Sequence, residues 1–241
     1  VYLAAGQFAT TRLIARSLGL QKKPIRILDS QYFFFPLFSY KRSRADIRFT
    51  LAEAFLGVLN EKLSSEYVHL QAYGKNAIFE QLLSQLAPTR GLAEQLIDRF
   101  FLLQGFLHSR DSGHLEFTLS KSTKIRDEIT IKGVPNEGSL RTARRVQGMI
   151  RQLLLGFGIV PPFSLEMVPN GRSYHTGGSF PMSGDDSVFF SDTLGRPAGL
   201  NRVHIMDAAS FPSIPGSPIL YTIMANADRI VTSAIDQIRS T

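Results

Sequence analysis

The sequence contains no cysteine and no tryptophan, and it has no long run of apolar residues. Without cysteine, the chain has no structural disulfide, no thiolate metal site and no cysteine nucleophile. The longest apolar runs, at 33–38 and 153–160, are far shorter than the roughly 20 residues that a membrane-spanning helix requires. No signal peptide is visible. We therefore expect no membrane span.

The composition is typical of a folded chain with a basic surface. Of the 241 residues, 44% are apolar and the formal net charge is +7, which allows one large domain or two small ones. A basic surface can attract nucleic acid or anionic lipid. The positive residues are dispersed, however, apart from short clusters at 41–44 and 144–145, and no segment interleaves aromatic and basic side chains as a base-stacking surface does. We predict a solvated basic face and no nucleic-acid partner.

Hydrophobic periodicity predicts a mixed α/β (or α+β) fold. The chain opens with a predicted strand at 1–5, a turn at Gly6 and a helix at 10–18. Because a protein seldom begins inside a buried strand, we expect an N-terminal part to be missing, removed or supplied by another chain. The segment around 32–35, between Pro24 and Pro36, is predicted to be irregular. Further strands are predicted at 55–59, 67–73, 115–119, 125–131 and 203–206, and helices at 78–86, 92–100, 139–157 and 218–238.

The predicted helix at 139–157 is amphipathic. Its apolar stripe consists of Val146, Met149, Ile150, Leu153 and Leu154. Its arginines lie largely away from that stripe, at positions 141, 144, 145 and 151. We interpret the segment as a helix that covers a sheet.

Three local patterns in the last third make little sense as packing alone. One loop places the imidazole of His175 beside two consecutive glycines, and a strand at 203–206 ends in Asp207 followed by small residues. The segment 213–218 then leads tightly into the last helix, with Ser217 as predicted N-cap and Pro218 as first helical residue. Each pattern alone is weak, since a loop histidine is often a surface side chain. Their order and spacing are what carry information.

Together these patterns resemble the C-terminal signature of the glucose–methanol–choline family of FAD-dependent oxidoreductases. The corresponding residues are His175, Asp192, Asp207-Ala208-Ala209 with Pro212, and the run from Met224 to Arg229. The opening segment resembles the second signature of that family, through Leu3-Ala4-Ala5-Gly6, Thr10-Thr11-Arg12-Leu13-Ile14 and Ser17. The middle of the chain, about 25–160, matches only in its succession of strands and helices.

The resemblance implies a division of the chain and an activity. Residues 1–20 and 165–241 would complete an FAD-binding domain, and residues 21–164 would form an inserted substrate-binding domain with an antiparallel sheet. The implied activity is oxidation of an alcohol, possibly a sugar, with FAD as hydride acceptor. The implied partners are a small-molecule alcohol or sugar and the N-terminal FAD-binding part, or a separate chain that supplies it.

The resemblance also implies roles for individual residues. His175 would be the base that removes the hydroxyl proton of the substrate while hydride passes to the flavin, because the pKa of imidazole lies near working pH. The helix dipole at the start of the last helix would stabilise negative charge on the reduced flavin by roughly 0.3–2 kcal/mol. The implied cofactor contacts are Ala5, Gly6, Asp207, Ala208, Ser217, Pro218 and Ile219.

Two features depart from the family pattern. The position at which the family carries a second His or an Asn falls on Pro218, so His69 and Gln71, at alternate positions of a predicted strand, are candidates to contact the substrate. The sequence also has no Gly-x-Gly-x-x-Gly turn to hold the cofactor phosphates, so we expect this chain alone to bind FAD poorly or not at all. An alternative function is therefore a non-catalytic or complementing part of a flavoprotein.

The remaining histidines and acidic residues carry no predicted chemistry. His108, His114 and His204 are predicted to be structural. No group of His, Asp and Glu has the spacing of metal ligands, so no metal is predicted. No Gly-x-Ser-x-Gly turn indicates a serine nucleophile.

Overall fold

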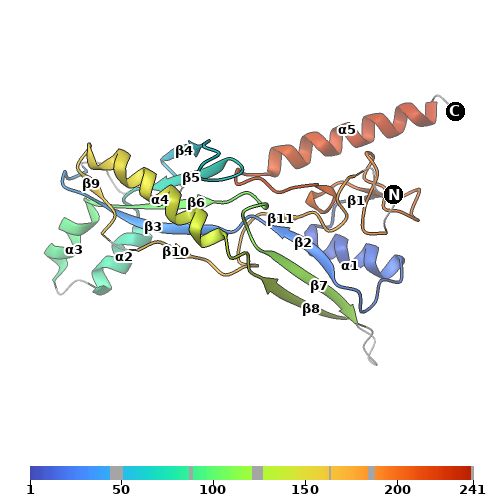
Figure 1. Cartoon of the computed structure of the whole chain (residues 1–241), viewed down its shortest axis with the longest axis horizontal. Coiled ribbons are helices and arrows are strands. Elements are labelled where there is room, and N and C mark those ends of the chain that lie inside the picture. The colour runs from blue at the N-terminus through green and yellow to red at the C-terminus, as the bar shows by residue number, and fades with distance from the viewer. Residues whose placement is uncertain (44–50, 87–88, 121–126, 163, 184–187, 240–241) are drawn as a thin grey trace. The chain divides into compact units, whose positions relative to one another are not determined.

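The computed structural model describes most of the chain, namely residues 1–43, 51–86, 89–120, 127–162, 164–183 and 188–239. The chain divides into two compact units, each built from segments that are distant in sequence (Figure 1). The first unit consists of residues 1–31, 108–136 and 169–241, and the second of residues 32–107 and 137–168. None of the helices that the structure describes has the length and apolar character needed to cross a bilayer.

The first unit combines a parallel strand pair with an antiparallel sheet. Strand β1 (Tyr2–Leu3) pairs in parallel with β12 (His204–Ile205), and a four-stranded sheet has the order β11-β2-β7-β8. Its strands are β2 (Ile25–Asp29), β7 (His114–Ser120), β8 (Glu128–Val134) and β11 (Thr176–Gly177), and its helical elements are α1 (Gln7–Ser17), a 3₁₀ turn η1 (Ala208–Ser210) and α5 (Leu220–Arg239).

Alternation of side chains explains how this sheet packs. Ile25 and Ile27 of β2 and Phe117 of β7 point to one face, where they are fully buried against Ile14 of α1. The period of two along each strand places every second residue on that face. Segments about 100 residues apart therefore share one core.

The second unit is a larger antiparallel sheet covered by helices. The sheet has the strand order β10-β3-β6-β5-β4, with β9 also paired to β3. Its strands are β3 (Tyr32–Ser39), β4 (Ala54–Val58), β5 (Val68–Tyr73), β6 (Phe100–Phe106), β9 (Ile159–Val160) and β10 (Glu166–Met167), and its helices are α2 (Ala77–Leu86), α3 (Arg90–Ile97) and α4 (Ser139–Leu155).

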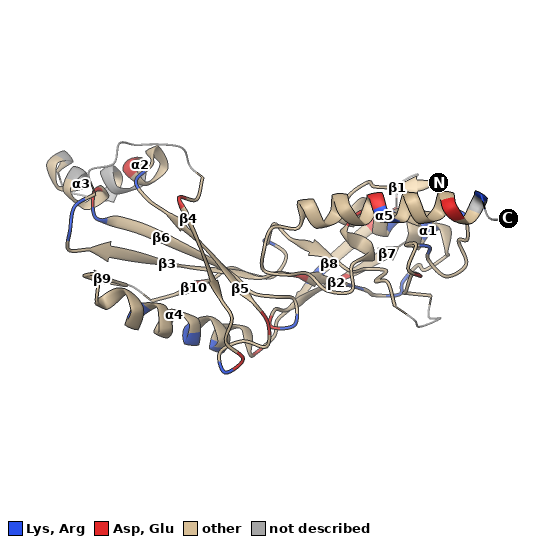
Figure 2. Ribbon diagram, turned by 90° about the horizontal axis from the view of Figure 1, so that it is seen from above, with Lys and Arg blue, Asp and Glu red and all other residues tan. Residues whose placement is uncertain are grey.

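Helix α4 lies along one face of this sheet (Figure 2). Its buried residues Ala143, Val146 and Ile150 pack with Phe33 and Leu103 of the sheet in one apolar cluster. Their spacing of three and four residues is that of one helix face. The predicted amphipathic helix that covers a sheet is confirmed.

The mixed α/β fold with an antiparallel sheet is confirmed, but strands β2, β3, β6 and β8 differ from the prediction. The passage around 25–39 forms β2 and β3 instead of an irregular segment, and the helix predicted at 92–100 ends at Ile97 before β6 begins. Pro36 is tolerated because β10 pairs with Phe33 and Phe34, β9 pairs further along β3, and neither pairs with Pro36 itself. Strand β8 begins later than the strand predicted at 125–131, of which 125 and 126 lie outside the described residues.

The compact units divide the chain differently from the predicted domains. The prediction placed 21–164 in one domain, whereas 21–31 and 108–136 pack in the first unit. The reason is that β2 and β7 bury their apolar face with α1. Which unit serves the cofactor and which the substrate stays a prediction.

Candidate active site

The carboxylate of Asp207 is the central acceptor of the first unit. It lies at the end of β12 with 7% of the residue exposed, and its Oδ2 accepts hydrogen bonds from Gly6 N (3.0 Å) and Thr10 Oγ1 (2.5 Å). Its Oδ1 accepts from Ala209 N at 3.0 Å, which caps η1. A buried carboxylate requires such donors. The side chain of Asp207 therefore joins the turn after β1 to the end of β12.

Gly6 forms the turn that this carboxylate holds. Its φ of 84° lies in the left-handed region that glycine adopts without strain, and α1 begins at the next residue. Inside α1, the hydroxyl of Thr11 donates to the carbonyl of Gln7 at 2.7 Å, and its oxygen lies 2.7 Å from Ser179 Oγ, which can donate to it. Thr10 and Thr11, which the sequence indicated only as part of a signature, thus connect α1 to both predicted functional segments.

The loop that carries His175 is held against β2. The N–H of Ser30 donates to the carbonyl of His175 at 3.0 Å, and Thr176 and Gly177 pair with Asp29 and Leu28. Residues 178–182 then run along η1 with three backbone hydrogen bonds, from Gly178 N to Ala208 O (2.8 Å), from Phe180 N to Ala209 O (2.9 Å) and from Met182 N to Ser210 O (2.8 Å). His175 and Asp207 therefore belong to one continuous backbone framework.

Glycine is required at the contact between the two segments. A Cβ on Gly177 would overlap the carbonyl oxygen of Ala208 and the side chain of Ile214. Gly178 has a φ of 66° and also packs against Leu28. The consecutive glycines after His175 thus allow the loop to lie directly on Ala208.

Asp29, which sequence reasoning missed, anchors the start of this loop. It is fully buried at the end of β2 and accepts hydrogen bonds from Gly171 N (2.9 Å) and from the hydroxyl of Ser173. In the sequence, Asp29 follows a run of apolar residues, but many aspartates at strand ends only cap a turn, and the sequence does not distinguish the two cases. Asp29 therefore fixes the backbone two residues before His175.

The start of α5 packs against the same framework. Ala208, Phe211, Ile214 and Ile219 form one buried apolar cluster, with Leu28 and Ile223 packed against it. Gly177 contacts Ala208 and Ile214 of this cluster and pairs with Leu28. The N-terminal end of α5 and the His175 loop thus share one set of packing partners.

The first residues of α5 differ from the prediction. The helix begins at Leu220, and its first backbone bond runs from Ile223 N to Ile219 O at 2.9 Å, so Ile219 occupies the N-cap position. The predicted roles of Ser217 as cap and Pro218 as first helical residue are wrong, because the apolar contacts of Ile219 set the helix start. Among the described residues, no hydrogen-bond partner is found for the hydroxyl of Ser217.

Two further residues of the matched segments are structural. Asp192 accepts from the backbone N–H groups of Leu194 and Arg196, both at 2.9 Å, and pairs with the side chain of Arg196 at 2.6 Å. Arg229 of α5 donates to the carbonyl of Thr193 at 2.7 Å. Together they tie the loop around 192–196 to α5.

The backbone at Asp207 and Ala208 fits a ligand that accepts hydrogen bonds. Among the described residues, no acceptor is found for the N–H of Asp207 or Ala208. The first N–H groups of a helix also have no partner within the helix and carry partial positive charge, as at the start of α5. These donors suit oxygen-rich or anionic parts of a flavin cofactor. A phosphate-binding glycine turn, in contrast, is not present in the 241 residues.

The two predicted substrate contacts lie in the second unit. His69 on β5 is 7% exposed and stacks on Phe55 at 5.6 Å, and burial lowers its pKa from the ordinary value. Its Nε2 has no hydrogen-bond partner in the part of the chain that the structure describes. Gln71 accepts a hydrogen bond from the hydroxyl of Tyr73 at 2.6 Å, and the same hydroxyl lies 3.2 Å from Gln104 Oε1. A role for His69 and Gln71 toward substrate stays a prediction.

The other histidines have structural environments. His108 Nδ1 accepts from Arg110 N at 3.2 Å within a turn, and His204 Nδ1 lies 3.0 Å from the carbonyl of Leu194. His114 is half-buried on β7, and burial followed by the charge of Arg26 lowers its pKa. Ala5, a predicted cofactor contact, is exposed between β1 and Gly6.

Comparison with known proteins supports the fold. No protein-family model matches the sequence, and no curated protein matches it. Among solved structures, pyridoxine 4-oxidase from Mesorbium loti is similar with a TM-score of 0.64 and 15% sequence identity, over 96% of this chain and 50% of that chain. The chain thus spans half the length of this solved structure. At this identity, the similarity concerns the fold.

Proposed function

We propose that the chain is the part of an FAD-dependent oxidoreductase that supplies the catalytic base, and that the reaction is oxidation of an alcohol. The observation that carries the proposal is the packing of the His175 loop on Ala208 beside the start of α5. A base can accept the hydroxyl proton, and backbone donors with a helix N-terminus can hold a cofactor that becomes negatively charged. The fold similarity to an oxidase, by its printed name, agrees with the proposal.

In this proposal, His175 holds the proton that leaves the substrate hydroxyl. Its Nδ1 is buried within the loop, so Nε2 is the ring nitrogen that would face the substrate. Neutral imidazole accepts the proton as the carbon–hydrogen bond breaks, because its ordinary pKa is near neutrality. FAD, when bound, supplies the hydride acceptor.

The backbone donors would hold the cofactor. The N–H groups of Asp207 and Ala208 are fixed by the side chain of Asp207, which is fully occupied by its own donors. The N-terminal end of α5 would stabilise negative charge on the reduced ring by roughly 0.3–2 kcal/mol. Asp207 therefore serves the cofactor through its backbone, and its carboxylate keeps the donors in place.

Ser217 is the group we propose beside the base, in place of the histidine or asparagine that Pro218 excludes. The hydroxyl of Ser217 is not used as a helix cap, because the cap position belongs to Ile219. A hydroxyl can donate to the substrate oxygen and accept from it. Ser217 lies next to Pro218 in the segment that leads into α5.

A second candidate function is that of a complementing subunit without activity of its own. The observation that favours it is the lack of a Gly-x-Gly-x-x-Gly turn in the 241 residues, since the cofactor phosphates then need donors from elsewhere. The same chain would still contribute His175 to a joint site. The two functions differ in whether this chain alone retains flavin.

The test measures flavin binding and reduction separately. The chain is titrated with FAD, alone and mixed with a flavin-binding chain that supplies the phosphate-binding turn, and the visible flavin absorbance is followed after anaerobic addition of pyridoxine, simple sugars and other primary and secondary alcohols. We expect bleaching by at least one of them. His175→Gln should retain bound flavin and lower the reduction rate by about 10²–10⁴-fold, and Ser217→Ala should lower it by about tenfold.

A matched control is His204→Gln, because the Nδ1 of His204 is held by Leu194 and the residue lies outside the proposed site. It should reduce flavin at the wild-type rate. Full activity of His175→Gln would exclude His175 as the base. A chain that retains no flavin by itself, but reduces it when mixed with a flavin-binding chain, would establish the complementing function.

A further inference from the structure

The outer face of α4 is a row of arginines. Arg141, Arg144, Arg145 and Arg151 are exposed and lie away from the buried residues, Arg141 and Arg145 on the opposite side of the helix and Arg144 and Arg151 on its flank. The helix contains no aspartate or glutamate, and Figure 2 shows Lys and Arg positions along it and no acidic one. This basic face, defined by the four arginines, is a local excess of positive charge.

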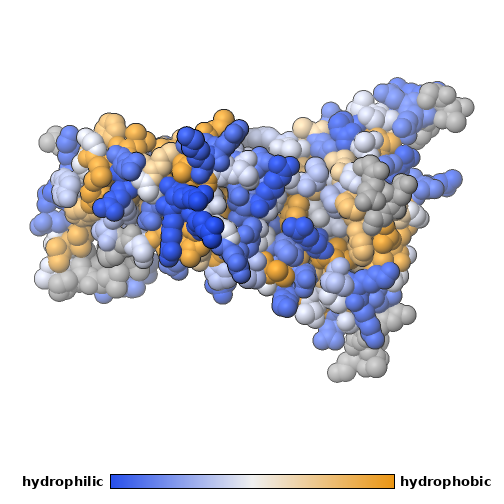
Figure 3. Space-filling model, in the orientation of Figure 1, coloured by the Kyte–Doolittle hydropathy of each residue, from blue (hydrophilic) through white to orange (hydrophobic). Residues whose placement is uncertain are grey.

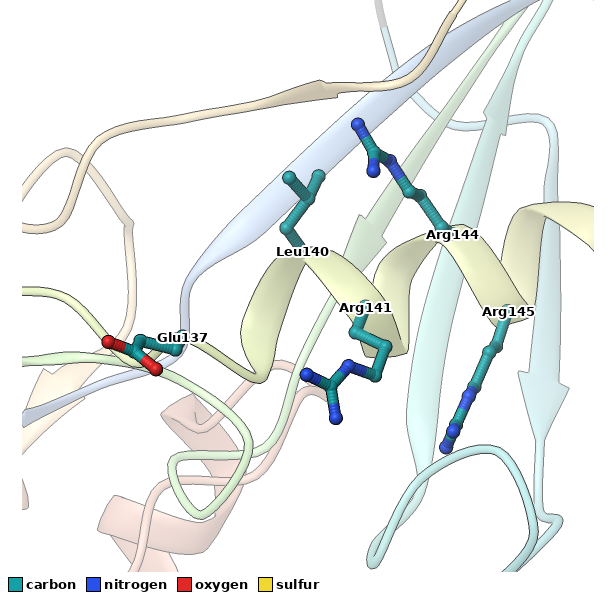
Figure 4. Close-up of a pocket in the computed structure, with 5 residues that line it drawn as sticks. All are labelled: Glu137, Leu140, Arg141, Arg144 and Arg145. Carbon is teal, nitrogen blue, oxygen red and sulfur yellow. The ribbon is translucent and has the colours of Figure 1, made fainter.

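The arginines of the basic face have no acidic ion-pair partner within the part of the chain that the structure describes. No carboxylate in the described residues forms an ion pair with Arg141, Arg144 or Arg145. These three line a shallow pocket of about 420 Å³ with Glu137 and Leu140. In Figure 4, Arg141 and Arg145 extend to one side of the helix, and Leu140 and Arg144 extend to the other. Their guanidinium groups are therefore available to an anionic partner.

Exposed apolar side chains lie at the C-terminal end of the same helix. Leu155 is 48% exposed, Phe157 67% and Tyr40 66%. Tyr40 lies near this end of α4, because its N–H donates to the carbonyl of Gly158, the residue after Phe157, at 2.9 Å. We refer to Leu155, Phe157 and Tyr40 as the apolar tip. Figure 3 shows strongly hydrophilic side chains over α4 and hydrophobic ones toward β9.

We propose that the basic face and the apolar tip of α4 dock on the surface of a bilayer that contains anionic phospholipids. Arginines are attracted to the negative surface potential of such a bilayer, and their planar donors match lipid phosphates. Exposed aromatic and aliphatic side chains enter the boundary between headgroups and acyl chains. The charge complementarity accounts for arginines that form no ion pair with a described carboxylate, and insertion at the headgroup boundary accounts for the exposed apolar tip at the end of the same helix.

This inference does not depend on the proposed oxidoreductase function. It concerns side chains of the second unit only, and it is measured without flavin. Failure of alcohol oxidation would therefore leave it unaffected, and failure of membrane docking would not contradict the proposed reaction.

The test is flotation of the chain with lipid vesicles. We expect binding to vesicles of phosphatidylcholine mixed with phosphatidylserine, weaker binding to phosphatidylcholine alone, and a decrease as salt is raised. The variant Arg141→Gln/Arg144→Gln/Arg145→Gln should bind the mixed vesicles at least about tenfold more weakly. A control with the same change of net charge, Lys23→Gln/Lys132→Gln/Arg202→Gln, alters exposed residues of the first unit and should bind nearly as the wild type does.

The apolar tip is tested by Leu155→Ser/Phe157→Ser, which should also weaken vesicle binding by several-fold. Its control is Leu51→Ser/Leu59→Ser, because these side chains are 74% and 83% exposed elsewhere in the same unit. Equal binding to both kinds of vesicle, or equal losses in the variants and their controls, would overturn the proposal. Arginine-dependent binding to RNA, with none to vesicles, would do the same.

Discussion

Thr10 and Asp207, 197 positions apart in the sequence, are joined by a hydrogen bond of 2.5 Å between Thr10 Oγ1 and Asp207 Oδ2. The same carboxylate also accepts from Gly6 N and Ala209 N. One buried side chain thus holds the first helix, the glycine turn before it and the segment that contacts the His175 loop. Asp207, which the sequence indicated as a cofactor contact, is by its side-chain contacts a residue that positions these segments.

Replacing Asp207 by asparagine should lower the free energy of unfolding by about 2–4 kcal/mol. The amide opposes one or two of the N–H and O–H groups that now donate to the carboxylate, and a buried donor without an acceptor costs about 1–3 kcal/mol. Urea unfolding followed by circular dichroism measures the change. The control is Asp228→Asn on the exposed side of α5, which should remain within about 0.5 kcal/mol of the wild type.

Adding one methyl group at Gly177 should destabilise the chain by about 1–3 kcal/mol, because the Cβ overlaps the carbonyl of Ala208 and the core cannot yield without strain. Gly148→Ala in α4 makes the same chemical change where nothing lies within 4 Å. It should stabilise the chain by up to about 1 kcal/mol, since alanine favours a helix interior. Thermal unfolding compares the two variants. Equal stability of Gly177→Ala and the wild type would mean that the His175 loop does not lie on Ala208.

Acidification should destabilise the second unit through His69. Burial lowers the pKa of His69 in the folded chain below its ordinary value of 6.5, so the unfolded state binds the proton more readily. The contribution of neutral, buried His69 to the free energy of unfolding is fully present above pH 6.5. It is lost as the pH falls from 6.5 toward the pKa of His69 in the folded chain. His69→Phe, which suits the contacts with Phe55 and Phe106, should reduce this loss.

The measurement for His69 is the urea midpoint at neutral pH and at mildly acidic pH. A residual pH dependence is expected in His69→Phe, because burial and Arg26 also lower the pKa of His114. His204→Gln serves as a control, since His204 lies in the first unit and its Nδ1 contacts the carbonyl of Leu194. An unchanged pH dependence in His69→Phe would contradict the proposed titration.

Much of the fold could be predicted because local patterns and packing agree. The helix over 139–157 has an apolar stripe that matches one sheet face, and β7 alternates as a strand with one buried side does. Strands β3 and β6 could not be predicted in the same way. Pro36 argues against a strand unless the neighbouring strand on one side leaves it unpaired. Phe100 continues the apolar helical spacing of the preceding residues in the sequence, but in the structure it pairs with Phe38 in the sheet.

The sequence displays the segments of the candidate site, whereas the contacts that each residue makes come only from the structure. His175 with its glycines and Asp207 with its small neighbours have spacings that a sequence displays directly. The role of Asp29 depends on the loop at 171–173, which folds back over the end of β2. Ser217 was expected to cap the last helix, but that helix begins at Leu220. Burial of Ile219 decides that start, and burial is a property of the assembled core.

The sequence by itself determined the absence of thiol chemistry, the alternation of strands and helices, and the order of the segments around His175, Asp207 and the last helix, because composition and periodicity are local properties. Only the tertiary structure decided that β2 and β7 belong with α1, that Asp207 is an internal acceptor and that the arginines of α4 have no acidic partner among the described residues. These features depend on contacts between residues far apart in the chain, and such contacts form only when the core has folded.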